Sequence, residues 1–157
     1  GWVAKQAEYE AEKQQQQLIE KRTIDNFRIG EMQPERDHNL VATEKSYVDI
    51  ALGRTGREAR RENNFSYTMK VNPGAANILL LTYIGDDKDR KFDVLVDGIK
   101  IAEVEWNGGI TGKFYDREYT IPAEVIGNKT SVTIKIDACH GKTAGRIFGS
   151  RILKSEK

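Results

Sequence analysis

The chain has 157 residues, which is enough for one domain with its own core and an extension, and too short for two ordinary domains. Its 25 Lys and Arg residues balance 24 Asp and Glu residues, so the formal net charge of +1 gives no strong field that would attract nucleic acid or an anionic membrane. No apolar run approaches the roughly 20 residues that cross a bilayer, and the single cysteine, Cys139, excludes an internal disulfide and a zinc site made of several thiolates.

Residues 2–22 predict a helix, because they contain no Gly or Pro and are rich in Ala, Glu, Gln and Lys. The apolar side chains of this segment form only a thin stripe, so no face of the helix is expected to be strongly buried. Two interpretations remain open. The helix is either a connector that leads out of a preceding domain, or a surface helix that lies against its own sheet.

A short strand at Thr23–Ile29 is followed by Gly30–Leu40, for which no regular element is predicted. This loop carries a dense set of polar groups, among them Arg36, Asp37 and His38. It is either a binding surface or a hydrogen-bonded knot that anchors the loop. The knot is the favoured interpretation over metal ligation by His38 and Asp37, because no second histidine lies nearby.

Val41–Ile50 has some β character, and Ala51–Asn64 follows with two Gly and four Arg, which indicates a loop. Four arginines invite comparison with a phosphate-binding patch. However, the glycines lack the spacing of a phosphate-binding motif, and Glu58 and Glu62 alternate with the arginines. A solvated loop with internal ion pairs is therefore predicted.

From Phe65 onward the sequence predicts short strands separated by turns. The clearest unit is Phe92–Trp106, in which Asp97-Gly98 separates two apolar runs and predicts a tight β-hairpin turn. Further strands are predicted at Phe65–Val71, Ile78–Tyr83, Phe114–Ile121, Ser131–Ile136 and Gly145–Leu153, with one helical turn at Ala123–Ile126. The unbroken apolar run Ile78–Tyr83 predicts a strand buried on both faces. About eight or nine short strands indicate an all-β fold, an antiparallel β-sandwich of two sheets.

The sequence offers no convincing nucleophile with a base to activate it. Cys139 and His140 are neighbours, and adjacent residues in an extended chain point to opposite sides, so Cys139 is interpreted as a structural thiol. Asp86, Asp87 and Asp89 cluster in a turn, where solvation or a calcium ion explains them better than acid–base catalysis.

The aromatic residues supply a second candidate surface. Trp106, Tyr115 and Tyr83 lie at or near strand ends beside turn and loop segments and could form a flat face on which a sugar ring stacks. Core packing is the favoured interpretation for Trp106 and Tyr115. The candidate ligand-binding residues are therefore Trp106, Tyr115, Tyr83, Arg36, Asp37 and His38, with no catalytic residue and no metal ligand predicted.

Five segments in order resemble the C-terminal accessory domain of bacterial beta-L-arabinofuranosidase-type glycoside hydrolases: GEMQPERDHNL (30–40), FSY (65–67), FDVLVDGIKIA (92–102), YDREYTIP (115–122) and AGRIFGSRIL (144–153). The resemblance covers residues 23–153. It implies a galactose-binding-like jelly roll that follows a catalytic (α/α)6 barrel. The zinc-bound cysteine and acidic residues of that family lie in the barrel, and Cys139 matches no such motif.

Taken together, residues 1–22 are predicted to be a helical connector and residues 23–157 a β-sandwich accessory domain. The expected function is that of a non-catalytic module of a multidomain glycoside hydrolase, which scaffolds the catalytic barrel or weakly binds carbohydrate. The expected partners are the catalytic domain of the same parent chain and a plant-type oligosaccharide, without nucleic acid, membrane, metal or cofactor. The resemblance favours a periplasmic or extracellular location. The alternative is a stand-alone hydrolase that uses His38 and Asp37.

Overall fold

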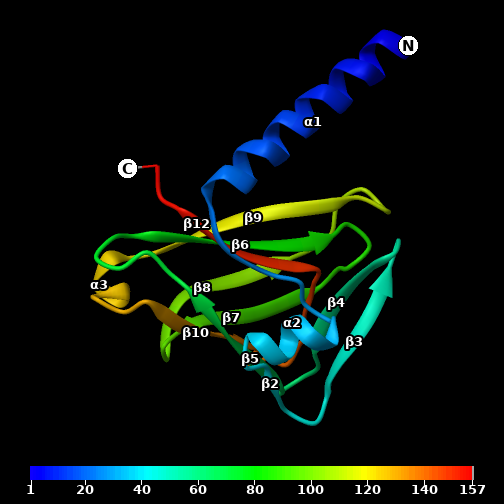
Figure 1. Cartoon of the computed structure of the whole chain (residues 1–157). Helices are drawn as coiled ribbons and strands as arrows, with labels where there is room; N and C mark the ends of the chain where they lie inside the picture. The colour runs from blue at the N-terminus through cyan, green and yellow to red at the C-terminus, as the bar shows by residue number, and fades with distance from the viewer. Residues whose placement is uncertain (157) are drawn as a thin grey trace.

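The computed structural model describes residues 1–156, which form a β-sandwich with a projecting N-terminal helix (Figure 1). Over these residues the chain runs in order through α1 (Trp2–Arg22), β1 (Thr23–Phe27), α2 (Met32–Asp37), β2 (Val41–Ala42), β3 (Ser46–Ala51), β4 (Arg54–Ala59), β5 (Asn64–Lys70), β6 (Asn77–Ile84), β7 (Arg90–Val96), β8 (Ile99–Trp106), β9 (Phe114–Ile121), α3 (Ala123–Ile126), β10 (Ser131–Asp137), β11 (Ala144–Ile147) and β12 (Gly149–Lys154).

The strands form two large antiparallel sheets and one small one. The four-stranded sheet has the order β1-β12-β6-β9, and the five-stranded sheet has the order β2-β5-β10-β7-β8. A three-stranded sheet, β11-β4-β3, lies at one side of the sandwich (Figure 1). The predicted all-β antiparallel sandwich with an N-terminal helix is therefore confirmed.

The core lies between the two large sheets and is built from the alternate residues of each strand whose side chains point inward. Tyr67 of β5 is fully buried, and its hydroxyl lies 2.8 Å from Ser150 Oγ of β12. Strand β6 is buried on both faces, as predicted: Leu79 and Leu81 belong to the main core, while Leu80 packs in a small cluster with Ile19.

The predicted hairpin is confirmed. Strands β7 and β8 pair antiparallel across Asp97-Gly98, whose φ angles of 48° and 83° lie in the left-handed region that Gly adopts without steric cost. The pairing shifts register between Val94 and Leu95.

Two segments predicted to be irregular are regular in the structure. The loop at 30–40 contains the short helix α2, and the Arg-rich segment contains strand β4. Strand β4 pairs with both β3 and β11, and this pairing buries Arg57 to 8% exposure. The prediction of a solvated loop over residues 54–59 was wrong because this pairing partner, β11, lies far away in sequence.

The strand predicted at Gly145–Leu153 is two strands in different sheets. Strand β11 joins the small sheet, whereas β12 joins the four-stranded sheet. The two strands are separated by Phe148, whose N–H donates to the Thr82 carbonyl oxygen. The chain thus changes sheets at Phe148, inside a segment that the sequence predicts as one strand.

Helix α1 forms as predicted and extends away from the sandwich (Figure 1). Of its 21 described residues, Ile19 alone is buried, so the helix lies against its own sheet only near its C-terminal end. Large apolar side chains remain exposed along it, including Trp2, Val3, Tyr9 and Leu18. Within residues 1–156, no helix combines the length and the apolar character needed to span a membrane.

Candidate functional site

The polar loop around His38 is held by its own hydrogen bonds. His38 Nδ1 donates to the Pro34 carbonyl oxygen at 2.8 Å, and Nε2 lies 3.1 Å from Asp25 Oδ1. The ring also stacks on Phe27, with 4.6 Å between ring centroids. Asp37 instead accepts a hydrogen bond from Gln33 Nε2. The carboxylate that faces the imidazole is therefore that of Asp25, whereas Asp37, named with His38 in the hydrolase alternative, binds Gln33.

The same loop is fixed to the sandwich by a bidentate ion pair. Arg57 Nε and Nη2 donate to the two carboxylate oxygens of Glu35, both at 2.9 Å. Arg57 Nη1 also donates to Ser46, and Glu35 accepts from the Gly30 N–H. These contacts form the hydrogen-bonded knot predicted for this segment and leave Arg36 exposed at its surface.

The aromatic candidates lie mainly in the core. Tyr83 is 1% exposed and Trp106 is 7% exposed. The indole Nε1–H of Trp106 donates to the Ile84 carbonyl oxygen at 2.9 Å, and burial raises the pKa of Tyr83 well above its usual value. Tyr115 is half-buried against Trp106, and its hydroxyl accepts from the Ile110 N–H. A sugar-stacking platform at Tyr83 and Trp106 does not fit this burial.

The acidic turn does not form a shared cation site. Asp87 is buried and receives a bidentate hydrogen bond from Arg146. Asp89 pairs with Lys142, and Asp86 accepts from a backbone N–H in the loop after β8. Because each carboxylate has a separate partner, calcium is not needed to explain the cluster.

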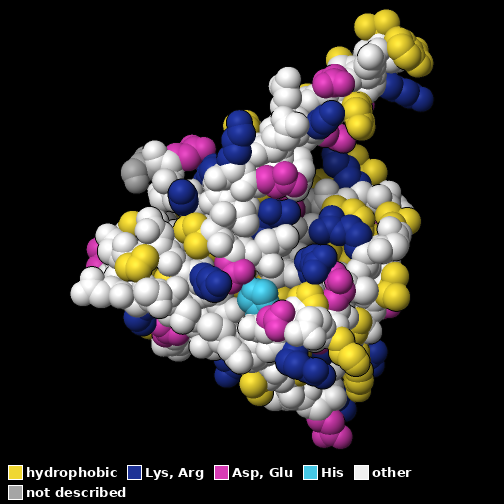
Figure 2. Space-filling view, viewed as in Figure 1, with side chains coloured by type: hydrophobic (Ala, Val, Ile, Leu, Met, Phe, Trp, Pro, Cys, Tyr) yellow, Lys and Arg dark blue, Asp and Glu magenta, His cyan; other side chains and the backbone are white. Residues whose placement is uncertain are grey.

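A groove of about 490 Å³ lies on the outer face of the four-stranded sheet. Residues from β1 and the segment after it, from the start of β4 and the turn before it, and from β6 and β12 line it. Its basic side chains are Arg28, Arg54 and Arg151. Figure 2 shows Lys and Arg side chains gathered on the body of the molecule below the base of α1. The volume lies within the range of about 300–1,000 Å³ that is typical of small-molecule sites.

Neighbouring groups position the guanidinium groups of this groove, which we call the arginine groove. Arg54 Nη2 donates to the Phe148 carbonyl oxygen, and the guanidinium lies 4.5 Å from the centre of the Phe114 ring. Local desolvation lowers the pKa of Arg54; Asp116 opposes this shift, whereas the positive charge of Arg151 adds to it. Arg151 Nη1 donates to Thr23 Oγ1.

Arg54 and Arg151 keep further N–H donors, because an arginine has five and these hydrogen bonds use only some of them. Arg28 forms an ion pair with Glu31 at 3.8 Å. None of the three arginines was among the sequence candidates. Arg54 lies in the Arg-rich window for which the sequence predicts a solvated loop. Arg151 lies in AGRIFGSRIL, one of the five segments that carry the family resemblance, and Arg28 lies in none of them. The groove forms between β1, β4 and β12, which are far apart in the sequence, so no local pattern predicts it.

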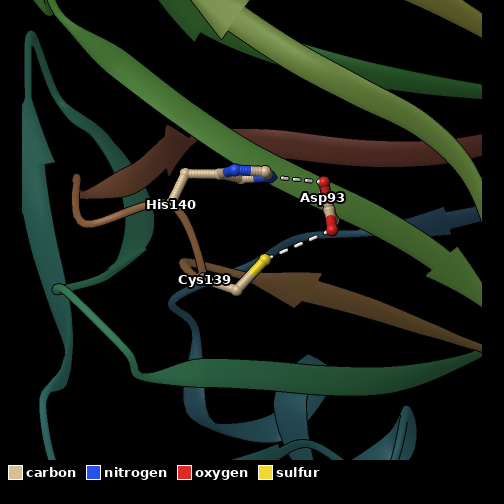
Figure 3. A group of neighbouring side chains, drawn as sticks. All are labelled: Asp93, Cys139 and His140. Carbon is tan, nitrogen blue, oxygen red and sulfur yellow. Dashed lines mark hydrogen bonds and ion pairs between the residues drawn. The ribbon is translucent and has the colours of Figure 1, made fainter.

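A second cluster lies on the outer face of the five-stranded sheet (Figure 3). Cys139 Sγ donates to Asp93 Oδ2 at 3.2 Å, and His140 Nε2 lies 2.7 Å from Asp93 Oδ1. The expectation that Cys139 and His140 point apart was wrong, because the turn after β10 directs both side chains toward Asp93.

The thiol of this cluster is not an activated nucleophile. Desolvation, followed by the hydrogen bond and negative charge of Asp93, raises the pKa of Cys139 to about 11. Burial tends to raise the pKa of Asp93, but the hydrogen bonds from His140 and Cys139 outweigh it and lower the pKa overall. A reactive cysteine needs a lowered pKa, so this geometry opposes thiolate catalysis.

The fold is similar to those of carbohydrate-binding modules. A family 35 carbohydrate binding module from Paenibacillus barcinonensis matches with a TM-score of 0.56 and 13% identity, covering 83% of this chain and 98% of the module. A family 35 module from an environmental isolate matches with a TM-score of 0.62 and 11% identity, over 84% and 94% of the two chains. The molecule therefore has the β-sandwich fold of these modules.

A longer enzyme contains a similar sandwich. The exo-beta-1,3-galactanase of Phanerochaete chrysosporium, solved with beta-1,3-galactotriose, matches 73% of this chain with a TM-score of 0.59 and 13% identity. The chain spans only 27% of that enzyme.

At the level of sequence, residues 18–153 match the profile described as a family of unknown function (DUF6805), so the chain belongs to that family. No curated protein matches the chain.

Proposed function

We propose that the chain is a non-catalytic β-sandwich module of a multidomain glycoside hydrolase, and that it contacts carbohydrate through the arginine groove. The observation that carries this proposal is a fold shared with carbohydrate binding modules over 94–98% of their length, combined with a polar groove of suitable volume. His38 faces Asp25 and Asp37 binds Gln33, and this supports the non-catalytic assignment over the hydrolase alternative that uses His38 and Asp37.

The groove chemistry suits a hydroxyl-rich ligand. Its guanidinium N–H groups can donate to sugar oxygens. The lining contains three arginines and one carboxylate, that of Glu31. This excess of positive charge favours oligosaccharides with carboxylate groups over neutral ones. The open shape of the groove supports weak binding.

The exposed helix supports an additional scaffolding role. Trp2 and Tyr9 are 77% and 62% exposed on a helix that extends away from the sandwich, and burial against a neighbouring domain would stabilise both. In this proposal α1 is the connector and residues 23–157 are the accessory domain. The resemblance of residues 23–153 to the accessory domain of beta-L-arabinofuranosidase-type enzymes supports a bacterial parent hydrolase outside the cytoplasm.

Calorimetric titration of the full chain tests the groove. The titrants are neutral arabinose-containing oligosaccharides and their carboxylate-bearing counterparts. We expect binding without turnover, tighter binding of the acidic ligands, and at least about a tenfold loss of affinity in Arg54→Ala or Arg151→Ala, because each removes charge-assisted hydrogen bonds.

Arg60→Ala is the matched control, because Arg60 comes from the same Arg-rich window but lies outside the groove. Thermal melts confirm that each variant is folded. Absence of binding to every glycan, or equal affinity in Arg54→Ala and wild type, would contradict the groove assignment. Turnover that His38→Ala abolishes would select the hydrolase instead.

The scaffolding role is tested in the parent chain. Replacing Trp2 and Tyr9 by Ser should increase protease sensitivity at the domain junction, while the melting temperature of the separate 157-residue chain stays within about 2 °C of wild type, because both side chains are exposed in it. Unchanged sensitivity in the parent would reject docking through α1.

A further inference from the structure

The cluster on the outer face of the five-stranded sheet has donor types that the proposed function does not use. Asp93, Cys139 and His140 each direct one potential metal-ligand atom to a common point, and these atoms lie within 4.8 Å of one another. Within residues 1–156, no other group of three such side chains comes this close together. The residues come from β7 and from the turn after β10 (Figure 3).

A fourth donor lies beside the three. Glu103 Oε1 of β8 is 3.4 Å from His140 Nε2. Asp93 and Glu103 face each other across the β7–β8 ladder, which holds these two carboxylates on one sheet. Glu103 lies outside the group of three whose donor atoms are all within 4.8 Å, so its side chain would move toward the other donors to complete a four-ligand site.

The donor set indicates the kind of metal. One sulfur, one imidazole nitrogen and carboxylate oxygens form a mixed set that suits Zn²⁺, whereas Ca²⁺ and Mg²⁺ prefer oxygen ligands alone. Zinc–ligand distances are about 2.0–2.3 Å, so tetrahedral ligand atoms lie roughly 3–4 Å apart. The His140–Asp93 contact of 2.7 Å would therefore need to open by about 1 Å or less to admit the ion.

Charge around the cluster is compatible with a bound cation. Lys100 Nζ lies 3.9 Å from Asp93, and Lys91 Nζ lies 3.4 Å from Glu103 and 3.5 Å from Glu105. With Zn²⁺ bound, the three anionic ligand groups carry one negative charge more than the ion. The two lysines can compensate for that excess.

We propose that Asp93, Cys139 and His140, completed by Glu103, form a zinc-binding site that fastens the turn after β10 to the outer face of β7 and β8. Zn²⁺ takes the place of the hydrogen atoms that now connect the thiol and the imidazole to Asp93. The thiol releases its proton to solvent when the Zn–S bond forms. The proton on His140 Nε2 is exchanged through solvent for one on Nδ1, so that the neutral imidazole binds zinc through Nε2. The proposal is independent of carbohydrate binding.

The test uses the full chain with zinc chloride alone in calorimetry and with cobalt chloride in absorption spectroscopy. We expect one metal ion per chain, a rise in melting temperature with zinc, and a thiolate-to-cobalt charge-transfer band. The band assigns the ligand without ambiguity, because Cys139 is the only cysteine. Cys139→Ser should abolish the band, and Cys139→Ser or His140→Gln should weaken zinc binding by at least about tenfold.

Asp89→Asn is the control, because Asp89 is an acidic residue of the neighbouring turn outside the donor set. It should bind zinc as wild type does. Circular dichroism keeps a folding defect distinct from the loss of a ligand. Absence of zinc binding, a cobalt complex without the thiolate band, or unchanged affinity in Cys139→Ser would overturn the proposal. So would a complex of two chains per zinc, since this site is built within one chain.

Discussion

The assignment of Trp106 to the core makes a strong prediction about stability. The side chain is 7% exposed, contacts Tyr83 and Tyr115 at centroid distances of 5.2 and 5.4 Å, and donates to the Ile84 carbonyl oxygen. Trp106→Ala removes these contacts and leaves a cavity, which costs about 3–5 kcal/mol of unfolding free energy. At about 2–4 °C per kcal/mol for a chain of this size, the melting temperature should fall by roughly 6–20 °C.

Differential scanning calorimetry measures this shift. The matched control is Trp2→Ala, because Trp2 is 77% exposed on α1 and its truncation should change stability by no more than about 0.5 kcal/mol. Trp106→Phe separates the two contributions. It keeps an aromatic ring but removes the indole donor and leaves the Ile84 carbonyl oxygen only the Asp87 N–H at 3.3 Å, at a cost of about 0.5–1.5 kcal/mol. If Trp106→Ala kept the wild-type melting temperature and lost only carbohydrate affinity, the core assignment would be refuted and the sugar platform reinstated.

Three further substitutions or reactions probe separate parts of the fold. Glu35→Ala leaves Arg57 buried without its bidentate partner, so urea unfolding should show a free energy of unfolding that is lower by about 2–3 kcal/mol. A decrease below about 0.5 kcal/mol would contradict the anchoring role. Without added metal at pH 8, Cys139 should react with iodoacetamide roughly 100-fold more slowly than a thiol of pKa 9.0, because its pKa of about 11 keeps the thiol protonated. Asp93→Asn should accelerate this reaction. A rate equal to that of a peptide thiol would exclude the raised pKa. Gly85→Ala places a Cβ 2.0 Å from a backbone carbonyl oxygen in the loop after β8. The free energy of unfolding should therefore fall by about 1–3 kcal/mol in the same urea assay. Wild-type stability would show that the two backbones do not approach so closely.

Local signals in the sequence were sufficient for the hairpin and for several strands. Asp97-Gly98 sets a turn by its own backbone preference, and the alternation along Phe65–Val71 identifies the buried face of β5 without reference to a partner. Strand β4 was missed for the opposite reason. Its Gly, Glu and Ala residues have low β propensity, and its pairing with β3 and β11 overrides that preference.

The candidate sites depend still more on distant contacts. The arginine groove joins residues from β1, β4, β6 and β12, and the Asp93 cluster joins β7 to the turn after β10. An extended chain at Cys139 and His140 predicts side chains that point apart, whereas the turn after β10 directs both side chains to Asp93. The residue types alone do not predict that the Asp93 carboxylate of β7 contacts both Cys139 and His140.

Local sequence signals specify an N-terminal helix followed by an antiparallel sandwich, because helix propensity, period-two alternation and turn residues act over a few neighbouring positions. Which polar groups meet depends on long-range packing. Arg57 finds Glu35, and Arg54 approaches Arg151, because sheet pairing and packing join segments separated by 22 or more residues. Pairings of that kind are fixed by the closing of the whole sandwich, and no local pattern encodes them.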